Sequence, residues 1–287
     1  MTPASCRTAQ RRPAPYGPGP GQGCKKGAGV RMPGLDQLNF EGQDLVQVTL
    51  SRIREHEPPE GYYVAFSGGK DSVVLFDLVQ RAGVKFDAHY NVTGIDPPEL
   101  VYFIRDFYPD VIPEMPLKRI WPLVEAKGLP RRTARFCCEY LKEHSGAGRL
   151  VVTGIRWAES VARRRRQMLE SCRWHRAKFF LHPIIDWPTE SVWSYIHREG
   201  LPYCRLYDEG FKRLGCVLCP MGSPAQAQLD MARWPKIAAA WRRAAGRFYN
   251  RGTPGTRRWR TAAEYLDWWL TREATPDPGD CQLDLFV

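Results

Sequence analysis

The segment that most constrains the fold is a glycine-containing loop. A short continuous apolar run precedes it, and apolar residues at helical spacing follow it. Residues Tyr62 to Phe66 form a short run rich in aromatic and branched side chains, which is typical of a buried strand. After Gly68 and Gly69, apolar residues from Val73 to Val79 recur at helical spacing. The sequence therefore predicts a strand, a tight loop and a helix. In open α/β sheets, ligands bind at such loops, at the carboxyl ends of the strands.

The other apolar segments extend this alternation of strands and helices. Further strands are predicted at residues 86–92, 150–155 and 179–185, and further helices at residues 45–53 and 98–108. Such alternation predicts an α/β fold with a mostly parallel sheet and helices on both faces. After Trp187 only helical spacing is found, which predicts a helical C-terminal subdomain. Its helices are expected at residues 190–198, 224–233, 235–249 and 262–272.

The loop itself carries groups that suit a phosphate ligand. Its glycines, Gly68 and Gly69, let backbone N–H groups converge on an anion, and the start of a helix adds a positive field. Ser67 and Ser72 can donate hydroxyl hydrogen bonds. Lys70 can neutralise phosphate, and Asp71 can hold Mg²⁺ between phosphate oxygens. The spacing differs from the G-x-x-x-x-G-K-[ST] loop, and a tight turn with a helix cap is the alternative interpretation.

Four of the nine cysteines form two pairs. Cys137 and Cys138 are adjacent, and Cys216 and Cys219 form a CxxC pair. Four cysteines are the usual ligands of an iron–sulfur cluster and also serve structural zinc. Adjacent cysteines reach the separate irons of a cubane more easily than one tetrahedral zinc, so the spacing favours a cluster. Zinc and buried free thiols are the alternatives.

The loop from Ser67 to Ser72 resembles the signature of the PP-loop ATP pyrophosphatases, also called adenine nucleotide alpha-hydrolases. Three further segments resemble motifs of the phosphoadenosine phosphosulfate reductase family within that superfamily: residues 91–94, with Thr93 and Gly94, residues 154–163, and residues 183–187 followed by 192–196. The resemblance implies an enzyme that splits ATP between the α and β phosphates, with Lys70 and Asp71 as catalytic residues and Mg²⁺ on Asp71. It implies a nucleotide site made of Ser67, Gly68, Gly69, Lys70, Asp71, Ser72, Thr93, Gly94, Gly154, Arg156 and Arg163.

The cysteine arrangement resembles the [4Fe-4S] site of adenylylsulfate reductases and of DNA phosphorothioation enzymes in the same family. This resemblance implies that Cys137, Cys138, Cys216 and Cys219 hold the cluster. One departure concerns the reaction. Assimilatory reductases carry a Glu-Cys-Gly-x-His segment with the attacking cysteine, whereas the residues around Cys281 are Gly-Asp-Cys-Gln-Leu. The departure favours ATP-dependent sulfur transfer over reduction of a sulfonucleotide.

Composition and charge set broader limits. With 43% hydrophobic and 25% charged residues the chain is globular, which excludes disordered, collagenous and disulfide-rich classes. It has no run of about 18 apolar residues to span a membrane and no apolar h-region of a secretory signal, so a cytoplasmic location is expected. The segments expected are a disordered basic Pro/Gly-rich tail at 1–38, a nucleotide-binding α/β domain at 39–187, a helical subdomain with the CxxC pair at 188–273 and a flexible tail at 274–287. Met32 is a second candidate for the start of translation.

Two further motifs suggest macromolecular partners. Residues 163–166 are four consecutive arginines, which form either a solvated surface or a phosphate track for a nucleotide or nucleic acid. Residues Gln282 to Phe286 resemble the pentapeptide by which bacterial proteins dock on the sliding clamp; an ordinary terminal segment is the alternative.

The function expected from these features is ATP pyrophosphatase activity in sulfur transfer, with nucleic acid as one acceptor class. Two alternatives remain: a reductase of adenylylsulfate or its 3′-phosphate that uses an external thiol, and a non-catalytic nucleotide-sensing or clamp-associated adaptor.

Overall fold

The computed structural model describes residue 42, residues 44–172 and residues 178–271. Its framework is a six-stranded sheet in the order β3-β2-β1-β4-β6-β5. Within this described part, every strand pairing is parallel except that of β5 with β6. The strands are β1 (Tyr62–Ala65), β2 (Phe86–Asn91), β3 (Ile112–Glu114), β4 (Leu150–Val152), β5 (Leu169–Ser171) and β6 (Phe179–Leu181). The predicted α/β fold with a mostly parallel sheet is confirmed.

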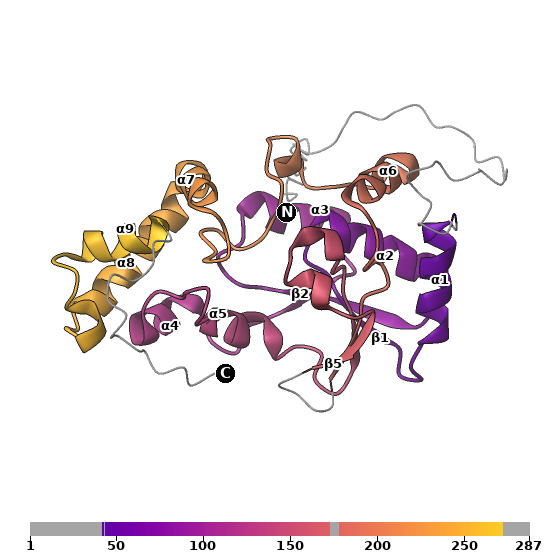
Figure 1. Cartoon of the computed structure of the whole chain (residues 1–287), viewed down its shortest axis with the longest axis horizontal. Coiled ribbons are helices and arrows are strands. Elements are labelled where there is room, and N and C mark those ends of the chain that lie inside the picture. The colour runs from indigo at the N-terminus through magenta and orange to yellow at the C-terminus, as the bar shows by residue number, and fades with distance from the viewer. Residues whose placement is uncertain (1–41, 43, 173–177, 272–287) are drawn as a thin grey trace, which may run out of the picture. The chain divides into compact units, whose positions relative to one another are not determined.

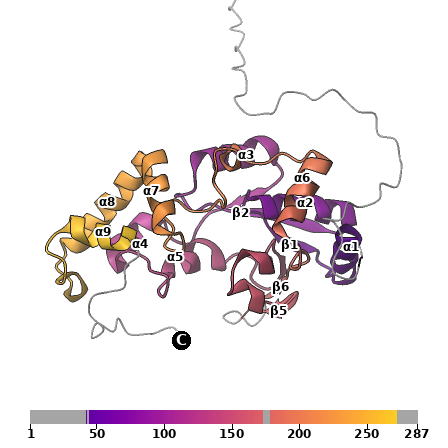
Figure 2. The same ribbon diagram turned by 45° about the horizontal axis from the view of Figure 1, so that its top comes forward.

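Two groups of helices are seen in Figure 1, one that includes α2 next to the sheet and one that lies to one side of it. Helices α1 and α6 pack on α2, whereas α8 contacts α4, α7 and α9. Figure 2 also shows α4 beside α8 and α9. The helices are α1 (Leu45–Glu55), α2 (Lys70–Ala82), α3 (Pro98–Phe107), α4 (Ile120–Lys127), α5 (Phe136–Cys138), α6 (Thr189–Glu199), α7 (Pro224–Arg233), α8 (Pro235–Tyr249) and α9 (Ala262–Thr271). The second group therefore takes one helix, α4, from the chain between β3 and β4.

Helix α2 covers the sheet and positions the glycine loop. It begins directly after Gly69 and ends at Gly83, whose φ of 72° is the left-handed conformation that glycine adopts without steric cost. Its apolar residues Val73 to Leu75, Leu78 and Val79 are all buried. Because the apolar side of α2 is buried, the helix is packed on the sheet, and its first turn follows the carboxyl end of β1.

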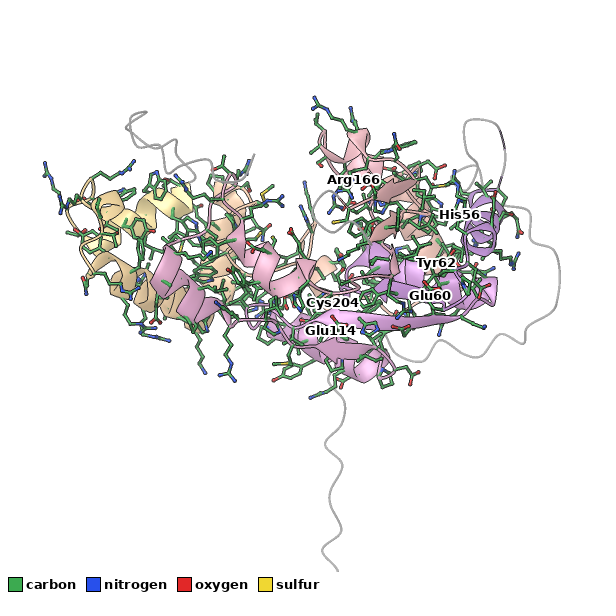
Figure 3. All side chains as sticks on the ribbon, turned by 90° about the horizontal axis from the view of Figure 1, so that it is seen from below. His56, Glu60, Tyr62, Glu114, Arg166 and Cys204 are labelled. Atoms are coloured by element: carbon green, nitrogen blue, oxygen red, sulfur yellow. The ribbon has the colours of Figure 1, made fainter. Side chains whose placement is uncertain are left out.

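Helix α1 ties the first strand to the turn after β6. Asp44 caps α1 by accepting a hydrogen bond from the Val46 N–H at 2.8 Å. Tyr62, labelled in Figure 3, donates to the Ile53 carbonyl at 2.7 Å. Arg52 donates to both carboxylate oxygens of Asp186, each at 2.8 Å. Bidentate pairs of this kind fix geometry as well as charge.

Most predicted elements are confirmed, with shifts at their ends. The strand predicted at residues 179–185 ends at Leu181, because Pro183 follows and proline cannot continue a sheet. The strand predicted at residues 150–155 ends at Val152. Strands β3 and β5 and helices α4 and α5 have no counterpart in the sequence-based assignment. The tails predicted at residues 1–38 and 274–287 lie essentially outside the described residues. No helix of the described residues is long and apolar enough to cross a membrane.

Candidate functional site

The glycine loop is shaped by contacts that only glycine permits. Gly68 has a φ of 71°, and a Cβ atom there would lie 2.7 Å from Cδ1 of Leu100 in α3. Ser72 closes the loop from inside: its hydroxyl donates to the Gly69 carbonyl at 2.8 Å and accepts from the Ser67 N–H at 3.2 Å. The loop therefore has one defined conformation, with the start of α2 facing a cavity.

Gly154 brings a second loop against the start of α2. A Cβ atom at Gly154 would lie 2.9 Å from the carbonyl carbon and oxygen of Asp71, which are backbone atoms that cannot rotate away. The chain after β4 therefore passes directly beside the first turn of α2. This approach carries Arg156 to the loop.

Three charged side chains form a row at this point, with Asp71 between the buried Lys70 and Arg156. Asp71 accepts from Lys70 Nζ at 3.0 Å through one carboxylate oxygen and from Arg156 Nε at 2.6 Å through the other. Lys70 is 7% exposed and Arg156 is 1% exposed. Arg156 also donates to the Trp187 carbonyl at 2.8 Å. Two cations face one carboxylate, so the row has an excess positive charge beside the loop.

Arg163 does not contact Lys70 or Asp71 directly but is linked to Arg156 through Glu159. It forms an ion pair with Glu159, and Glu159 accepts from the Arg156 N–H at 2.9 Å. Arg163 thus reaches the loop through Glu159 and Arg156, although it lines the same cavity. Its role as a direct phosphate ligand stays a prediction.

Tyr207 is a site residue that the sequence analysis missed. It ends a 3₁₀ turn, η5 (Arg205–Tyr207), and its hydroxyl accepts a hydrogen bond from the Lys70 N–H at 2.9 Å. Burial raises the pKa of this phenol. The long separation in sequence between Tyr207 and the loop leaves no local pattern from which the contact could be recognised.

The second predicted motif links the loop region to the cysteines. Thr93 is 2% exposed, and its hydroxyl donates to the thiol of Cys216. The Val217 N–H donates to the Ile95 carbonyl at 2.8 Å. Gly94 has a φ of 74° and turns the chain between these contacts. The structure therefore places Thr93 against the CxxC loop.

Cys137, Cys138, Cys216 and Cys219, called the four-cysteine set below, line the same cavity of about 2180 Å³ as Lys70 and Asp71. Cys137 and Cys138 are the last two residues of α5, and the chain continues as a π-helical turn at Glu139–Glu143. Single π-helical turns occur frequently at functional sites. Cys219 follows Leu218, whose φ of 60° is unusual for a residue with a branched side chain.

Charge interactions connect the members of the four-cysteine set. A hydrogen bond from Cys137, together with the charges of Lys142 and Arg135, lowers the pKa of Cys138 to about 6. The same hydrogen bond raises the pKa of Cys137, to which the charges of Cys216 and Cys219 also contribute. Burial raises the pKa of Cys216 to about 11.

A cysteine-bound anionic cluster fits this donor set. Four thiols share a cavity wall with two cations, Lys142 and Arg135, that can balance thiolate charge. Among the described residues, no three Cys, His, Asp or Glu side chains converge on a point suited to one metal ion. The assignment of [4Fe-4S] over zinc or free thiols stays a prediction.

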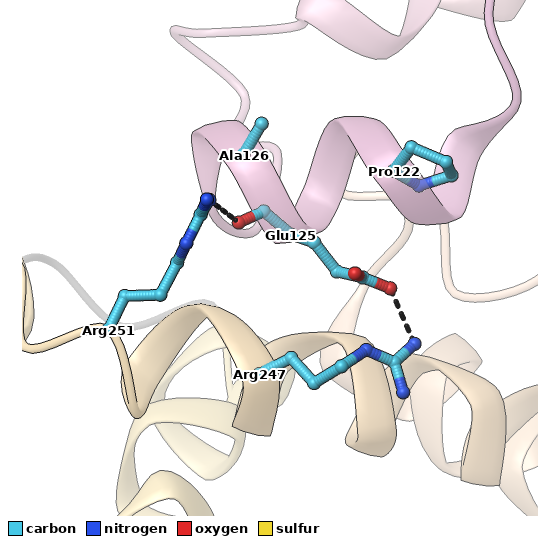
Figure 4. Close-up of a pocket in the computed structure, with 5 residues that line it drawn as sticks. All are labelled: Pro122, Glu125, Ala126, Arg247 and Arg251. Carbon is cyan, nitrogen blue, oxygen red and sulfur yellow. Dashed lines mark hydrogen bonds and ion pairs between the residues drawn. The ribbon is translucent and has the colours of Figure 1, made fainter.

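A second, smaller cavity lies between α4 and α8, away from these residues (Figure 4). It has a volume of about 430 Å³ and is lined by Pro122, Glu125, Ala126, Arg247 and Arg251. Arg247 donates to the Glu125 carboxylate at 2.5 Å, and Arg251 donates to its carbonyl at 2.6 Å. These contacts join α4 to α8 and to the residue Arg251 that follows it.

The parallel sheet and the Ser-Gly-Gly loop at the start of α2 define a protein of the PP-loop superfamily. Residues 61–222, more than half of the 287 residues, match the phosphoadenosine phosphosulfate reductase domain. The chain belongs to the phosphoadenosine phosphosulfate reductase family.

Individual relatives show how far the similarity extends. Two uncharacterized proteins of Methanocaldococcus jannaschii are 30% and 28% identical, over 62% of this chain and 40% and 46% of their own length. The chain thus spans less than half the length of these two relatives. Adenosine 5′-phosphosulfate reductase 2 of Bacillus subtilis is 27% identical over 59% of this chain and 77% of that protein. The crystal structure of phosphoadenylyl-sulfate reductase from Candida auris has a TM-score of 0.46 at 18% identity, covering 62% of this chain and 96% of that one.

Proposed function

We propose that the chain binds Mg·ATP at the loop Ser67 to Ser72 and a [4Fe-4S] cluster at the four-cysteine set, and that it uses ATP to activate an acceptor for sulfur transfer. The observation that carries this proposal is the shared cavity: the loop and the four thiols line one space. Thr93 supports the link, since it follows β2 at the same sheet edge as the loop and contacts Cys216.

The chemistry follows from the charges at the loop. An acceptor oxygen attacks the α-phosphorus of ATP, the bond to the β-phosphate oxygen breaks, and pyrophosphate leaves as the acceptor loses a proton. Lys70 stabilises the leaving charge, and Asp71 would hold the magnesium ion. A hydrosulfide then displaces AMP from the acceptor, so that sulfur replaces oxygen without electron transfer. A bound cluster would supply an iron site for sulfur.

A sulfonucleotide reductase is the second candidate, and the names of several relatives favour it. Proteins of Bacillus subtilis and of Geobacillus species that match this chain are named adenosine 5′-phosphosulfate reductases. In such a reaction an external thiol would attack the sulfur of the sulfonucleotide, AMP would leave, and a second thiol would release sulfite.

Product analysis of anaerobically purified protein separates these functions. Pyrophosphate release from ATP supports the first proposal, and sulfite release from adenylylsulfate or its 3′-phosphate with a dithiol supports the second. Release of neither product, with nucleotide bound, indicates the adaptor that the sequence leaves as a third interpretation.

Iron and sulfide analysis tests the cluster. Wild-type protein should contain near-stoichiometric iron and sulfide, and Cys216→Ser should lose both. Cys172→Ser is a matched control, because Cys172 lines the same cavity without belonging to the four-cysteine set. A colourless protein with one zinc would contradict the cluster.

Exposed basic residues at the cavity support nucleic acid as the acceptor class. Arg165, Lys212 and Arg213 are exposed and line the cavity. No ion pair within the described part of the chain involves any of the three. Unpaired cations beside a site neutralise phosphates of a nucleic acid backbone and make binding dependent on salt.

Oligonucleotide binding at several salt concentrations tests this acceptor class. The double variant Arg165→Ala, Arg213→Ala should bind a single-stranded oligonucleotide at least tenfold more weakly and with a shallower salt dependence. Arg105→Ala is the control, since exposed Arg105 pairs with Asp106 outside the cavity. Equal losses in both proteins would contradict the proposal.

The motif Gln282 to Phe286 lies outside the described residues, and we propose it as a sliding-clamp ligand. Leu285 and Phe286 would be its apolar anchors. Replacing both with alanine should abolish binding to a bacterial sliding clamp and leave iron content unchanged. Clamp binding that survives the replacement would remove this partner.

A further inference from the structure

The hydrogen bond between Tyr207 and the start of α2 is unexpected for a phosphate-binding loop. Lys70 is the first residue of α2, and its N–H is one of the donors that a helix cannot satisfy internally. Such donors bind the oxygen atoms of phosphate ligands. Here the Lys70 N–H already has an acceptor, the Tyr207 hydroxyl oxygen at 2.9 Å.

The surroundings of Tyr207 place its hydroxyl against the start of α2, beside Gly69 and Lys70. The Lys70 ammonium lies 5.9 Å from the centroid of the Tyr207 ring. A Cβ atom at Gly69 would lie 3.4 Å from the Tyr207 hydroxyl. Both Tyr207 and Lys70 line the cavity. The hydroxyl oxygen therefore occupies space next to the backbone donor and the cation that a phosphate would use.

We propose that the Tyr207 hydroxyl holds the position of a phosphate oxygen at the start of α2, and that an incoming phosphate displaces it. The inference rests on the proposed nucleotide site at the loop. On binding, the Lys70 N–H would exchange the Tyr207 hydroxyl oxygen for a phosphate oxygen. The binding free energy gained from this hydrogen bond is therefore smaller than if the N–H had no acceptor beforehand. Tyr207 is in this sense a positioning residue that sets the affinity for phosphate.

Other contacts hold the rest of Tyr207 in place. Its ring packs against Trp193 at 5.1 Å between centroids, and the Gly210 N–H donates to the Tyr207 carbonyl at 3.1 Å. Displacement by phosphate therefore concerns the hydroxyl end of the side chain.

The test is isothermal titration of Tyr207→Phe with three probes: inorganic pyrophosphate, an ATP analogue with a methylene group between the α and β phosphates, and adenosine. Without the hydroxyl, the Lys70 N–H has no protein acceptor until a phosphate arrives. Pyrophosphate and the analogue should therefore bind more tightly by about 5- to 100-fold, the range expected for an unpaired buried donor. Adenosine, which has no phosphate, should bind unchanged.

Thermal unfolding distinguishes displacement from a purely structural role. If phosphate displaces the hydroxyl, the variant should melt below wild type without ligand and at the same temperature with saturating analogue. Tyr203→Phe is the matched control: Tyr203 also packs on Trp193, but its hydroxyl donates to Asp208 at 3.0 Å. This control should leave affinity for all three probes unchanged.

The remaining outcomes overturn the inference in separable ways. Weaker phosphate binding by Tyr207→Phe would mean that the hydroxyl donates to the ligand. Unchanged affinity, with equal loss of melting temperature in free and bound protein, would mean a structural bond. In both cases wild type binds the analogue and the proposed nucleotide site survives. Failure of wild type and variant alike to bind it would overturn the nucleotide site as well.

Discussion

At the residue scale, the geometry of the glycine loop depends on the Tyr207 hydroxyl and on the missing Cβ atom of Gly154. The Ser-Gly-Gly-Lys-Asp-Ser loop and both cysteine pairs could be identified from sequence, because local spacing and residue type carry them. The partners that complete the site could not. Tyr207 reaches the loop across 136 intervening residues, and the contact of Gly154 with Asp71 arises only after β1 and β4 have paired.

Gly154→Ala tests that contact. The new methyl group would lie 2.9 Å from backbone atoms of Asp71, so the start of α2 must shift. We expect at least a tenfold loss of affinity for the ATP analogue and a loss of about 1–3 kcal/mol in the free energy of unfolding, as in overpacked cores. Gly255→Ala, which has nothing within 4 Å of its Cβ, should change neither quantity.

His182 predicts a pH dependence of stability. It is 0% exposed, and burial lowers its pKa to about 4, against the opposing effect of Glu170 and with Arg166 and Arg163 nearby. Its Nδ1 lies 2.7 Å from the Thr153 hydroxyl. The unfolded chain, with a histidine pKa of about 6.5, binds the proton first as pH falls. Stability should therefore decrease from about pH 6.5 to about pH 4 and level off below.

Chemical denaturation at several pH values measures this slope. Between pH 6.5 and pH 4 the free energy of unfolding should decrease by up to about 3 kcal/mol, because each unit of pKa shift corresponds to about 1.4 kcal/mol. His182→Gln should be less stable than wild type near neutral pH and should show a flatter profile between pH 4.5 and pH 6.5. An equally steep profile in the variant would assign the slope to other groups.

At the scale of elements, segments with a clear apolar pattern could be predicted from the sequence, and segments without one could not. Helices α7 and α8 have the bounds expected from sequence, because ten or more residues repeat at helical spacing. Strand β3 has three residues with Pro113 in the middle, and α4 carries Pro122 near its start. Proline weakens the sequence signal for either element. Strand β5 has only one apolar residue, Leu169, so it shows no apolar run, whereas the equally short strands β4 and β6 are apolar throughout and were predicted.

Two glycines, one inside α8 and one at the end of α6, allow a matched pair of substitutions. Gly246 lies inside α8 with nothing within 4 Å of its Cβ, and Gly200 ends α6 with a φ of 65°. Gly246→Ala should stabilise the protein by about 0.5–1 kcal/mol through helix propensity. Gly200→Ala should destabilise it by about 1 kcal/mol, because alanine disfavours the left-handed conformation. Urea denaturation measures both, and shifts of the same sign would contradict this account of the helix ends.

For the molecule as a whole, the packing of α4 on α8 predicts cooperative unfolding of the α/β sheet and the helical group. Trp241 in α8 contacts Trp121 in α4 at 5.4 Å and Trp269 in α9 at 4.9 Å between ring centroids. Since α4 belongs to the chain between β3 and β4, this aromatic contact is lost when either part unfolds. Urea transitions followed by tryptophan fluorescence and by far-ultraviolet circular dichroism should coincide. Two separated transitions would show that residues 188–273 unfold independently.

The strand order has a consequence for how the protein is made. Strand β1 can pair with β2 on one side once residue 91 has been translated. Its other side can pair only after β4 has been translated, because Tyr63 pairs with Val151 there. Parallel pairing between segments so far apart in the chain is slow. Until then β1, whose residues Tyr62 to Val64 are fully apolar or aromatic, has an open edge that can pair with another chain. Aggregation during synthesis should therefore be governed by the time between translation of β2 and translation of β4.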